Sequence, residues 1–418
     1  MTYRENKHGE KVSLLGYGMM RLPTVDGKHA NGWAEGVSSQ PIDQDEVNKE
    51  IDYALAHGLT YVDTSPAYCR GESERVTGIA LARHDRSEFT IATKLSNFAP
   101  QFWSFEASKA MYENSFKELQ VDHIDYYLLH SVGNSAKDLN GKDLDGFETF
   151  KRRYIDNGIL DFLVEERKAG RIRNLGFSYH GDVRAFNWCM ENHEKYHWDF
   201  CQIQMNYVDW HHAQQVNPRN QDGIWLYNEL DKREIPIVIM EPLLGGRLAR
   251  FDAALASKLK PIDPEASLAS WALRFCGSFP RVMTILSGMT KFEHVVENVD
   301  TLSPLKPLNE HEFEVLEEAA KLYVGGKTIP CNDCQYCMPC PYGIDIPRNL
   351  LTWNRGVSHE YLDDKQAFLA DYDKIPHLRR ADHCIQCRRC VSHCPQSIHI
   401  PEELLRIEKH VAALRDAK

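Results

Sequence analysis

From residue 12 to about residue 320, the chain alternates short, β-rich apolar stretches with longer amphipathic ones. The β-rich stretches are VSLLGYG, LTYVDTS, FTIATK, IDYYLLH, IRNLGFS, DFCQIQMN, IPIVIMEP and VMTILSG. Parallel neighbouring strands need a crossover helix between them, and eight such units close a sheet into a barrel. The periodicity of a single stretch does not distinguish a strand from a helix, so the prediction rests on the repetition of the alternating pattern. The sequence therefore predicts an α/β fold, a (β/α)8 barrel of the TIM type.

The length and charge of the chain limit the classes of protein to which it can belong. At 418 residues it is longer than an average domain, which favours a large barrel with an appended unit. A formal net charge of -11 argues against nucleic-acid binding, because such proteins usually carry a basic face. The N-terminus MTYRENKHGE is polar and no stretch approaches eighteen consecutive apolar residues, so we expect no membrane span and a cytoplasmic, small-molecule enzyme.

Three connections that follow strands are long, at residues 22–44, 131–146 and 207–221. In a (β/α)8 barrel these loops surround the substrate site at the C-terminal face. The segments ANGWAEG and DWHHAQ are therefore candidate substrate walls, although any single residue there is equally compatible with a solvated connection.

Polar side chains stand at the C-terminal ends of successive predicted strands. Asp63 and Tyr68 follow the second strand, Lys94 closes the third and His130 closes the fourth. Taken singly, such an aspartate is usually a cap or turn residue and such a histidine a satisfied rim residue. Together they converge in one barrel mouth and predict a catalytic site.

The motifs GEKVSLLGYGMMRLP, HGLTYVDTSPAY, SERVTGIAL, IATK, DYYLLH, GRIRNLGFS, CQIQMN and VVENV resemble the aldo-keto reductase family, in family order, over roughly residues 9–320. The resemblance implies that Asp63, Tyr68, Lys94 and His130 form the family's catalytic tetrad. Tyr68 would protonate the carbonyl oxygen, and Lys94, held by Asp63, would ease the ionisation of the phenol. His130 would orient and polarise the carbonyl.

The resemblance also implies a set of nicotinamide contacts, namely Ser178, Gln202, Met240, Glu297 and Asn298. Two positions depart from the family pattern. Tyr179 stands where an asparagine is expected, and Met240 replaces a stacking tyrosine, although a thioether can cover a ring face. The only basic residues near the Glu-Asn pair are Lys291 and His294, so the choice between NADP and NAD stays open.

Eight of the twelve cysteines fall in two runs. The first, C-x2-C-x2-C-x2-C-P, ends at Pro341, and the second, C-x2-C-x2-C-x3-C-P, ends at Pro395. Such confinement predicts metal ligands and not disulfides. A tight cysteine triplet wraps one iron–sulfur cube while the distant fourth cysteine ligates the other. We therefore predict two [4Fe–4S] clusters, one on Cys331, Cys334, Cys337 and Cys394 and the other on Cys384, Cys387, Cys390 and Cys340. Paired zinc sites are the alternative, but zinc needs neither a third cysteine at this spacing nor a trailing proline.

The cysteine-rich unit is expected to span residues 323–418, after a barrel at residues 1–322. It resembles bacterial two-cluster ferredoxins. Its cysteine runs, however, are separated by a long segment of helical character, as in the helical dicluster modules of respiratory and anaerobic oxidoreductases. With little apolar material, its folding should depend on its clusters.

The two units carry different chemistries, because aldo-keto reductases move hydrides whereas iron–sulfur clusters move single electrons. The sequence holds no flavin-binding fingerprint, so a flavin that splits the electron pair would be hidden or supplied by a partner. The leading hypothesis is an NAD(P)H-dependent oxidoreductase acting on a small carbonyl or alcohol, whose clusters exchange electrons with the substrate site or with an electron-transfer protein. The alternatives are an electron-transfer or redox-sensing protein whose barrel binds nicotinamide without carbonyl turnover, and an enzyme whose clusters are purely structural.

Overall fold

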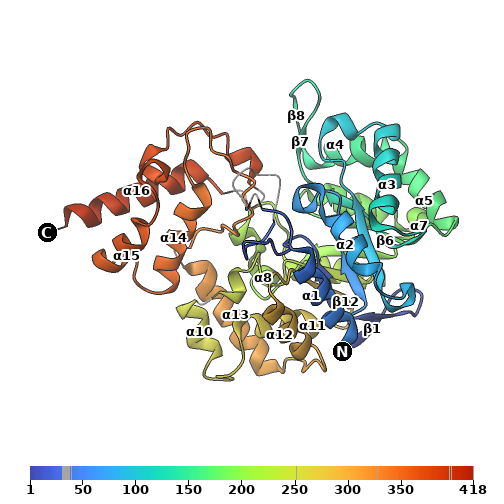
Figure 1. Cartoon of the computed structure of the whole chain (residues 1–418), viewed down its shortest axis with the longest axis horizontal. Coiled ribbons are helices and arrows are strands. Elements are labelled where there is room, and N and C mark those ends of the chain that lie inside the picture. The colour runs from blue at the N-terminus through green and yellow to red at the C-terminus, as the bar shows by residue number, and fades with distance from the viewer. Residues whose placement is uncertain are drawn as a thin grey trace.

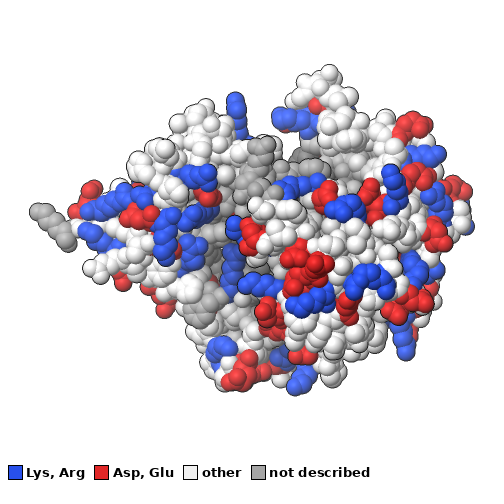
Figure 2. Space-filling model, viewed as in Figure 1, with Lys and Arg blue, Asp and Glu red and all other residues white. Residues whose placement is uncertain are grey.

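The computed structural model describes residues 1–30, 38, 40–250, 252–326, 328–394, 396 and 398–417. The candidate wall ANGWAEG lies outside the described residues except for its first position, and Pro395 lies outside them too. In the described part of the chain, no helix has the length and apolar character needed to cross a membrane. Acidic and basic side chains are mixed over the face of the molecule shown in Figure 2.

Eight parallel strands close the predicted barrel, and each falls on one of the predicted stretches, although β5, β6 and β9 run one or two residues past theirs. In order around the barrel they are β3 (Leu15–Gly18), β4 (Tyr61–Asp63), β5 (Thr90–Leu95), β6 (Ile124–Val132), β9 (Ile172–Tyr179), β10 (Phe200–Gln204), β11 (Ile237–Met240) and β12 (Val282–Ser287), and β12 pairs with β3. Parallel strands covered on both faces read as continuous apolar runs, and every residue of β6 is buried. An antiparallel hairpin, β1 (Tyr3–Glu5) and β2 (Lys11–Ser13), precedes the barrel and contributes Val12 to its inner core.

Amphipathic helices surround the strands. They are α1 (Gln44–Ala56), α2 (Ser73–Leu81), α3 (Phe105–Leu119), α4 (Gly146–Phe150), α5 (Ile159–Lys168), α6 (Val183–Glu191), α7 (His193–Tyr196), α8 (Asp209–Val216), α9 (Gly223–Asp231), α10 (Ala253–Leu259), α11 (Leu268–Gly277), α12 (Phe292–Thr301) and α13 (Glu310–Gly325). Side-chain caps define several starts: Asp43 accepts from the Glu46 N–H at α1, and Asn309 and Glu312 form a capping box at α13. The long connection at 131–146 carries a two-stranded ribbon, β7 (Ala136–Lys137) and β8 (Asp143–Leu144), and DWHHAQ lies in α8.

The expected boundary between residues 322 and 323 falls inside a helix. Helix α13 continues to Gly325, and Tyr323 packs in the barrel core. A separate apolar core begins at Ile329. The division between the two cores therefore lies in the short segment after α13.

The C-terminal module is mostly helical, as predicted. It contains α14 (Ile346–Ser358), α15 (Lys365–Tyr372) and α16 (Ile400–Asp416), and its core includes Trp353, Phe368 and Ile407. Figure 1 shows the module, in orange to red, beside the barrel. The Ser358 hydroxyl donates to the Asp252 carboxylate at 3.0 Å, which joins the end of α14 to the start of α10.

Candidate active site

The four predicted tetrad residues come together at the barrel mouth. Asp63 ends β4, Lys94 lies in β5 and His130 lies in β6, so neighbouring strands present them side by side. The Lys94 ammonium donates to Asp63 Oδ1 at 2.6 Å and to the Thr64 carbonyl at 2.8 Å. Its Nζ lies 4.8 Å from the centroid of the Tyr68 ring. The register of a parallel barrel thus builds the cluster from distant parts of the sequence.

Lys94 and Asp63 form a buried ion pair. Both side chains are almost fully excluded from solvent, at 0% and 3% exposure. Burial lowers the pKa of Lys94, and the adjacent Asp63 carboxylate opposes that shift. Since either charge alone would be costly at this depth, each residue requires the other.

Tyr68 holds its proton firmly. Burial of its hydroxyl raises the pKa of Tyr68 well above its ordinary value, and the negative charge of Asp63 raises it further. In this geometry burial outweighs the eased ionisation expected from Lys94, whose ammonium lies over the face of the Tyr68 ring. The residue is therefore a protonated phenol, which is the form that a proton donor needs.

His130 is a neutral imidazole. Burial, and then the charge of Lys94, lowers the pKa of His130 well below its ordinary value. Its Nδ1 lies 2.6 Å from the Ser96 hydroxyl, and its ring meets the Tyr68 ring edge to face at a centroid distance of 5.8 Å. When Ser96 donates to Nδ1, the proton of the ring is on Nε2, which leaves an N–H for a carbonyl oxygen.

A cavity of about 1220 Å³ opens over the tetrad. Asp63, Tyr68 and His130 line it, together with Cys334 and Cys394 of the C-terminal module. Small-molecule pockets commonly measure roughly 300–1,000 Å³. The cavity therefore has room for more than one small ligand, and the two units of the chain share it.

The nicotinamide contacts expected from the sequence divide into two groups. Gln202, Met240, Glu297 and Asn298 line the cavity. Ser178 is fully buried and its hydroxyl accepts from the Ser131 N–H at 2.9 Å, so it lies beneath the lining. The Oε1 atom of Gln202 is buried without a hydrogen-bond partner. A carboxamide N–H₂ is a donor that would satisfy it, so the residues present fit a nicotinamide.

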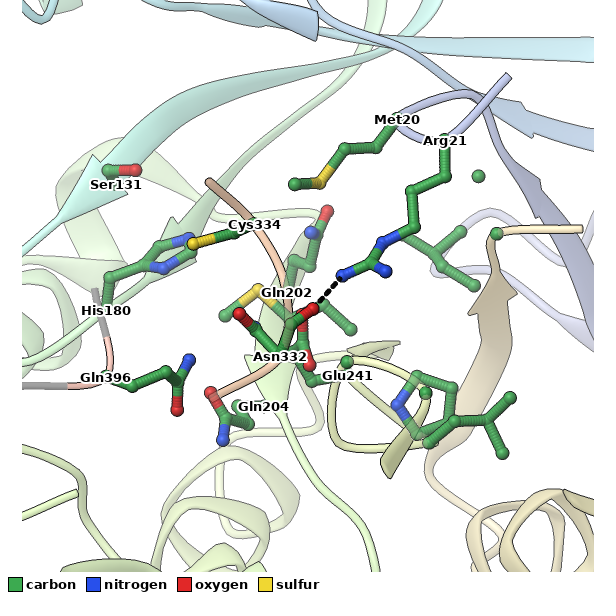
Figure 3. Close-up of a pocket in the computed structure, with 18 of the residues that line it drawn as sticks. Met20, Arg21, Ser131, His180, Gln202, Gln204, Glu241, Asn332, Cys334 and Gln396 are labelled. Atoms are coloured by element: carbon green, nitrogen blue, oxygen red, sulfur yellow. Dashed lines mark hydrogen bonds between the residues drawn. The ribbon is translucent and has the colours of Figure 1, made fainter. Parts of the chain in front are cut away.

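Several residues that line the cavity were not predicted from the sequence. His180 directly follows β9, and burial lowers its pKa to about 4. Glu241 follows Met240 with a left-handed φ of 56° and a buried, unpartnered Oε2 atom. Figure 3 shows both side chains around the same space as Gln204 and the module residue Gln396. Position after a strand end could have signalled His180 and Glu241, but nothing in the sequence pointed to Gln396.

Cysteines of the two runs influence one another electrostatically, and Cys337 is affected by both Cys394 and Cys390. The pKa values of Cys331, Cys334 and Cys337 are raised by burial and further by a negative charge at Cys394, which is distant in sequence. The pKa values of Cys384 and Cys390 are likewise raised by burial and then by a charge at Cys340. A second cavity, of about 290 Å³, is lined by Cys337 and by the four cysteines Cys340, Cys384, Cys387 and Cys390.

Comparisons with known proteins identify both units. The model of the Aldo/keto reductase family matches residues 15–321, and that of the 4Fe-4S dicluster domain matches residues 330–399. The chain thus belongs to the aldo/keto reductase family and carries a 4Fe-4S dicluster domain after the barrel.

Individual relatives are distant. The chain is 23% identical to the uncharacterized oxidoreductase YqkF of Bacillus subtilis over 299 residues, covering 65% of this chain and 86% of that protein. The holo form of aldo-keto reductase AKR11C1 from Bacillus halodurans aligns with a TM-score of 0.56 and 21% identity, over 76% of this chain and 96% of that one. The thermostable aldo-keto reductase Tm1743, in complex with epalrestat, gives a TM-score of 0.55 and 22% identity, over 76% and 100%. These structures support the barrel fold.

Proposed function

We propose that the barrel catalyses the NAD(P)H-dependent reduction of an aldehyde or ketone, or the reverse oxidation, and that the C-terminal module holds two [4Fe–4S] clusters for electron transfer. The observation that carries this proposal is the single cavity lined by Asp63, Tyr68 and His130 of the barrel and by Cys334 and Cys394 of the module. Membership of the aldo/keto reductase family supports the oxidoreductase class.

Tyr68 would be the proton donor. Its phenol is protonated and lies at the cavity surface next to His130, so a carbonyl oxygen can meet the Tyr68 O–H and the His130 Nε2–H together. These two donors stabilise the negative charge that develops on the oxygen. The positive charge of Lys94 stabilises the phenolate left after proton transfer, and the bond from Lys94 to Asp63 keeps that charge in place.

A reduced nicotinamide, when bound, supplies the hydride to the carbonyl carbon. Gln202 would bind its carboxamide through the unpartnered Oε1, Met240 would cover the ring, and Glu297 and Asn298 would contact the adenosine portion. Lys291 and His294 also line the cavity and would offer basic groups to a ribose phosphate.

The cluster ligands would be Cys331, Cys334, Cys337 and Cys394 for the inner site and Cys384, Cys387, Cys390 and Cys340 for the outer site. The electrostatic influence between cysteines of the two runs and the match to the dicluster domain support this assignment. The clusters would supply single electrons. Cys334 and Cys394 line the shared cavity, which supports an inner site next to it. Cys387 is solvent-exposed and would make the outer site accessible to an electron-transfer protein.

The test is an anaerobic assay of the reconstituted holoprotein with NADPH or NADH and a panel of aldehydes and ketones. We expect carbonyl-dependent oxidation of the nicotinamide, and we expect Tyr68→Phe to reduce kcat by about 10²–10⁴-fold, the usual contribution of a general acid. The exposed Tyr342 of the module provides the matched control, since Tyr342→Phe removes a hydroxyl outside this cavity.

Full turnover by Tyr68→Phe would overturn the role of Tyr68. If no carbonyl supports turnover and NADPH still binds, the redox-sensing alternative replaces the reductase. Reduction of the clusters by NADPH alone, followed by their visible absorbance, would show that the two units exchange electrons within the protein.

A further inference from the structure

One wall of the active-site cavity comes from the cysteine module. Asn332, Cys334, Tyr336 and Met338, four residues at alternate positions of the first cysteine run, all line it. Figure 3 shows the side chains of Asn332 and Cys334 in the same space as Gln202 and His180 of the barrel. Asp63, Tyr68 and His130 of the predicted tetrad line the same cavity.

The wall is fitted to the barrel surface. The Arg21 guanidinium, from the loop after β3, donates to the Asn332 carbonyl at 3.2 Å, the bond dashed in Figure 3. Asn332 also packs over the loop after β11, where a Cβ built on Gly245 would lie 2.3 Å from the Asn332 Cβ. The Asn354 amide of α14 pairs with both backbone groups of Ile329, at 2.7 Å each, and fixes the start of the run.

Tyr336 is the aromatic residue of this wall. It lines the same cavity as Tyr68 and His130 of the predicted tetrad. Its ring is a large amphipathic surface with a donor at the tip.

We propose that Tyr336 is a substrate-positioning residue that limits the size of the carbonyl substituent accepted at Tyr68. The inference rests on the proposed carbonyl reductase function and extends it, because it makes the substrate site a joint product of barrel and module. The carbonyl oxygen meets Tyr68 and His130, while the substituent on the carbonyl carbon fills the space between the strand ends and the Tyr336 ring. Substrate selectivity is therefore encoded within the cysteine run.

The experiment compares Tyr336→Ala, Tyr336→Phe and Tyr336→Trp with wild-type holoprotein, using propanal and hexanal as short and long probes with saturating NADPH. We expect Tyr336→Ala to raise the KM for propanal about tenfold with a smaller change in kcat, the size of a lost apolar contact in a binding pocket. Hexanal should gain relative to propanal in the Ala variant and lose in the Trp variant. Tyr336→Phe separates the contribution of the hydroxyl from that of the ring.

Two measurements distinguish positioning from structural damage. Iron content and the dissociation constant for NADPH should stay within about twofold of wild type in each variant, because neither the cysteines nor the nicotinamide contacts are altered. Tyr342→Ala, at an exposed tyrosine of the same module, should leave the ratio of hexanal to propanal kcat/KM unchanged. If Tyr336→Ala loses iron, the Phe and Trp variants decide the question.

An unchanged ratio in iron-replete Ala and Trp variants would overturn the inference while leaving the reductase proposal intact. A wild-type protein that turns over neither aldehyde, nor any other carbonyl of the panel, would overturn the reductase proposal, and the role of Tyr336 with it.

Discussion

The buried ion pair between Lys94 and Asp63 allows a quantitative test of the site. Lys94→Met removes the ammonium and leaves an Asp63 carboxylate that is 2% exposed and already lacks a partner at Oδ2. Breaking a buried pair in this way typically costs about 3–5 kcal/mol, because the remaining charge is uncompensated. With roughly 2 °C of Tm lost per kcal/mol for a large domain, we expect a drop on the order of 6–10 °C at pH 8.

The pH dependence has a defined sign. Without Lys94, burial raises the pKa of Asp63 further, so protonation in the folded state removes the unpaired charge. A raised folded-state pKa contributes stability that is present at low pH and lost as pH rises. The deficit of Lys94→Met should therefore shrink as pH falls, and the double variant with Asp63→Asn should recover most of the stability.

Thermal unfolding followed by circular dichroism across pH, with iron content checked, gives these values. A Tm within about 1 °C of wild type for Lys94→Met would refute the reasoning, as would a double variant that is no more stable than the single one.

Three further predictions concern other parts of the chain. Burial raises the pKa of Glu50 to about 7, so its contribution to stability is present below the unfolded pKa and lost as pH rises through 7. Glu50→Gln should therefore flatten the dependence of Tm on pH and raise Tm at pH 8. Cys394→Ser should remove the same cluster as Cys331→Ser, with about half of the iron lost in each and one set of electron paramagnetic resonance signals missing in both. Gly245→Ala should increase hydrogen exchange at residues 331–338 and raise the substrate KM, because its Cβ meets the module at 2.3 Å.

Each of these predictions has its own control. Gly246 also has a left-handed φ but nothing within 4 Å of an added Cβ, so Gly246→Ala isolates the backbone strain; equal effects of the two variants would contradict the fitted interface. An unchanged pH profile in Glu50→Gln would show that the carboxyl is ionised in the folded protein. Loss of different spectral signals in the two cysteine variants would contradict the crossed ligand assignment.

The barrel was predictable because its information is local and repeated. Each strand is a short apolar run such as IDYYLLH, and parallel strands can close only through crossover helices, so the pattern left one architecture. The end of the barrel was less accessible, because α13 runs to Gly325 through a position where the sequence suggested a linker. Helix ends depend on packing as well as composition, and Tyr323 is fixed by the barrel core.

The grouping of the predicted tetrad residues was also accessible from sequence, since Asp63, Lys94 and His130 occupy the same relative place at successive strand ends. The electrostatics of this site were not predictable from the sequence. Sequence reasoning expected Lys94 to ease the ionisation of Tyr68, whereas burial raises the pKa of Tyr68. Desolvation depends on what covers a group, which no spacing in the chain reveals.

By itself, the sequence determined the two kinds of unit in this protein, because repeated strand patterns and cysteine spacing are local features that a backbone geometry converts directly into structure. Only the tertiary structure decided that the two units line one shared cavity. The segment from Asn332 to Met338 packs on the barrel through Arg21 and Gly245, and so Tyr336 lines the same cavity as Tyr68, more than 260 residues away in the sequence. This contact depends on shape complementarity between the surfaces of two units that have separate cores. The order of residues in the chain does not reveal such complementarity.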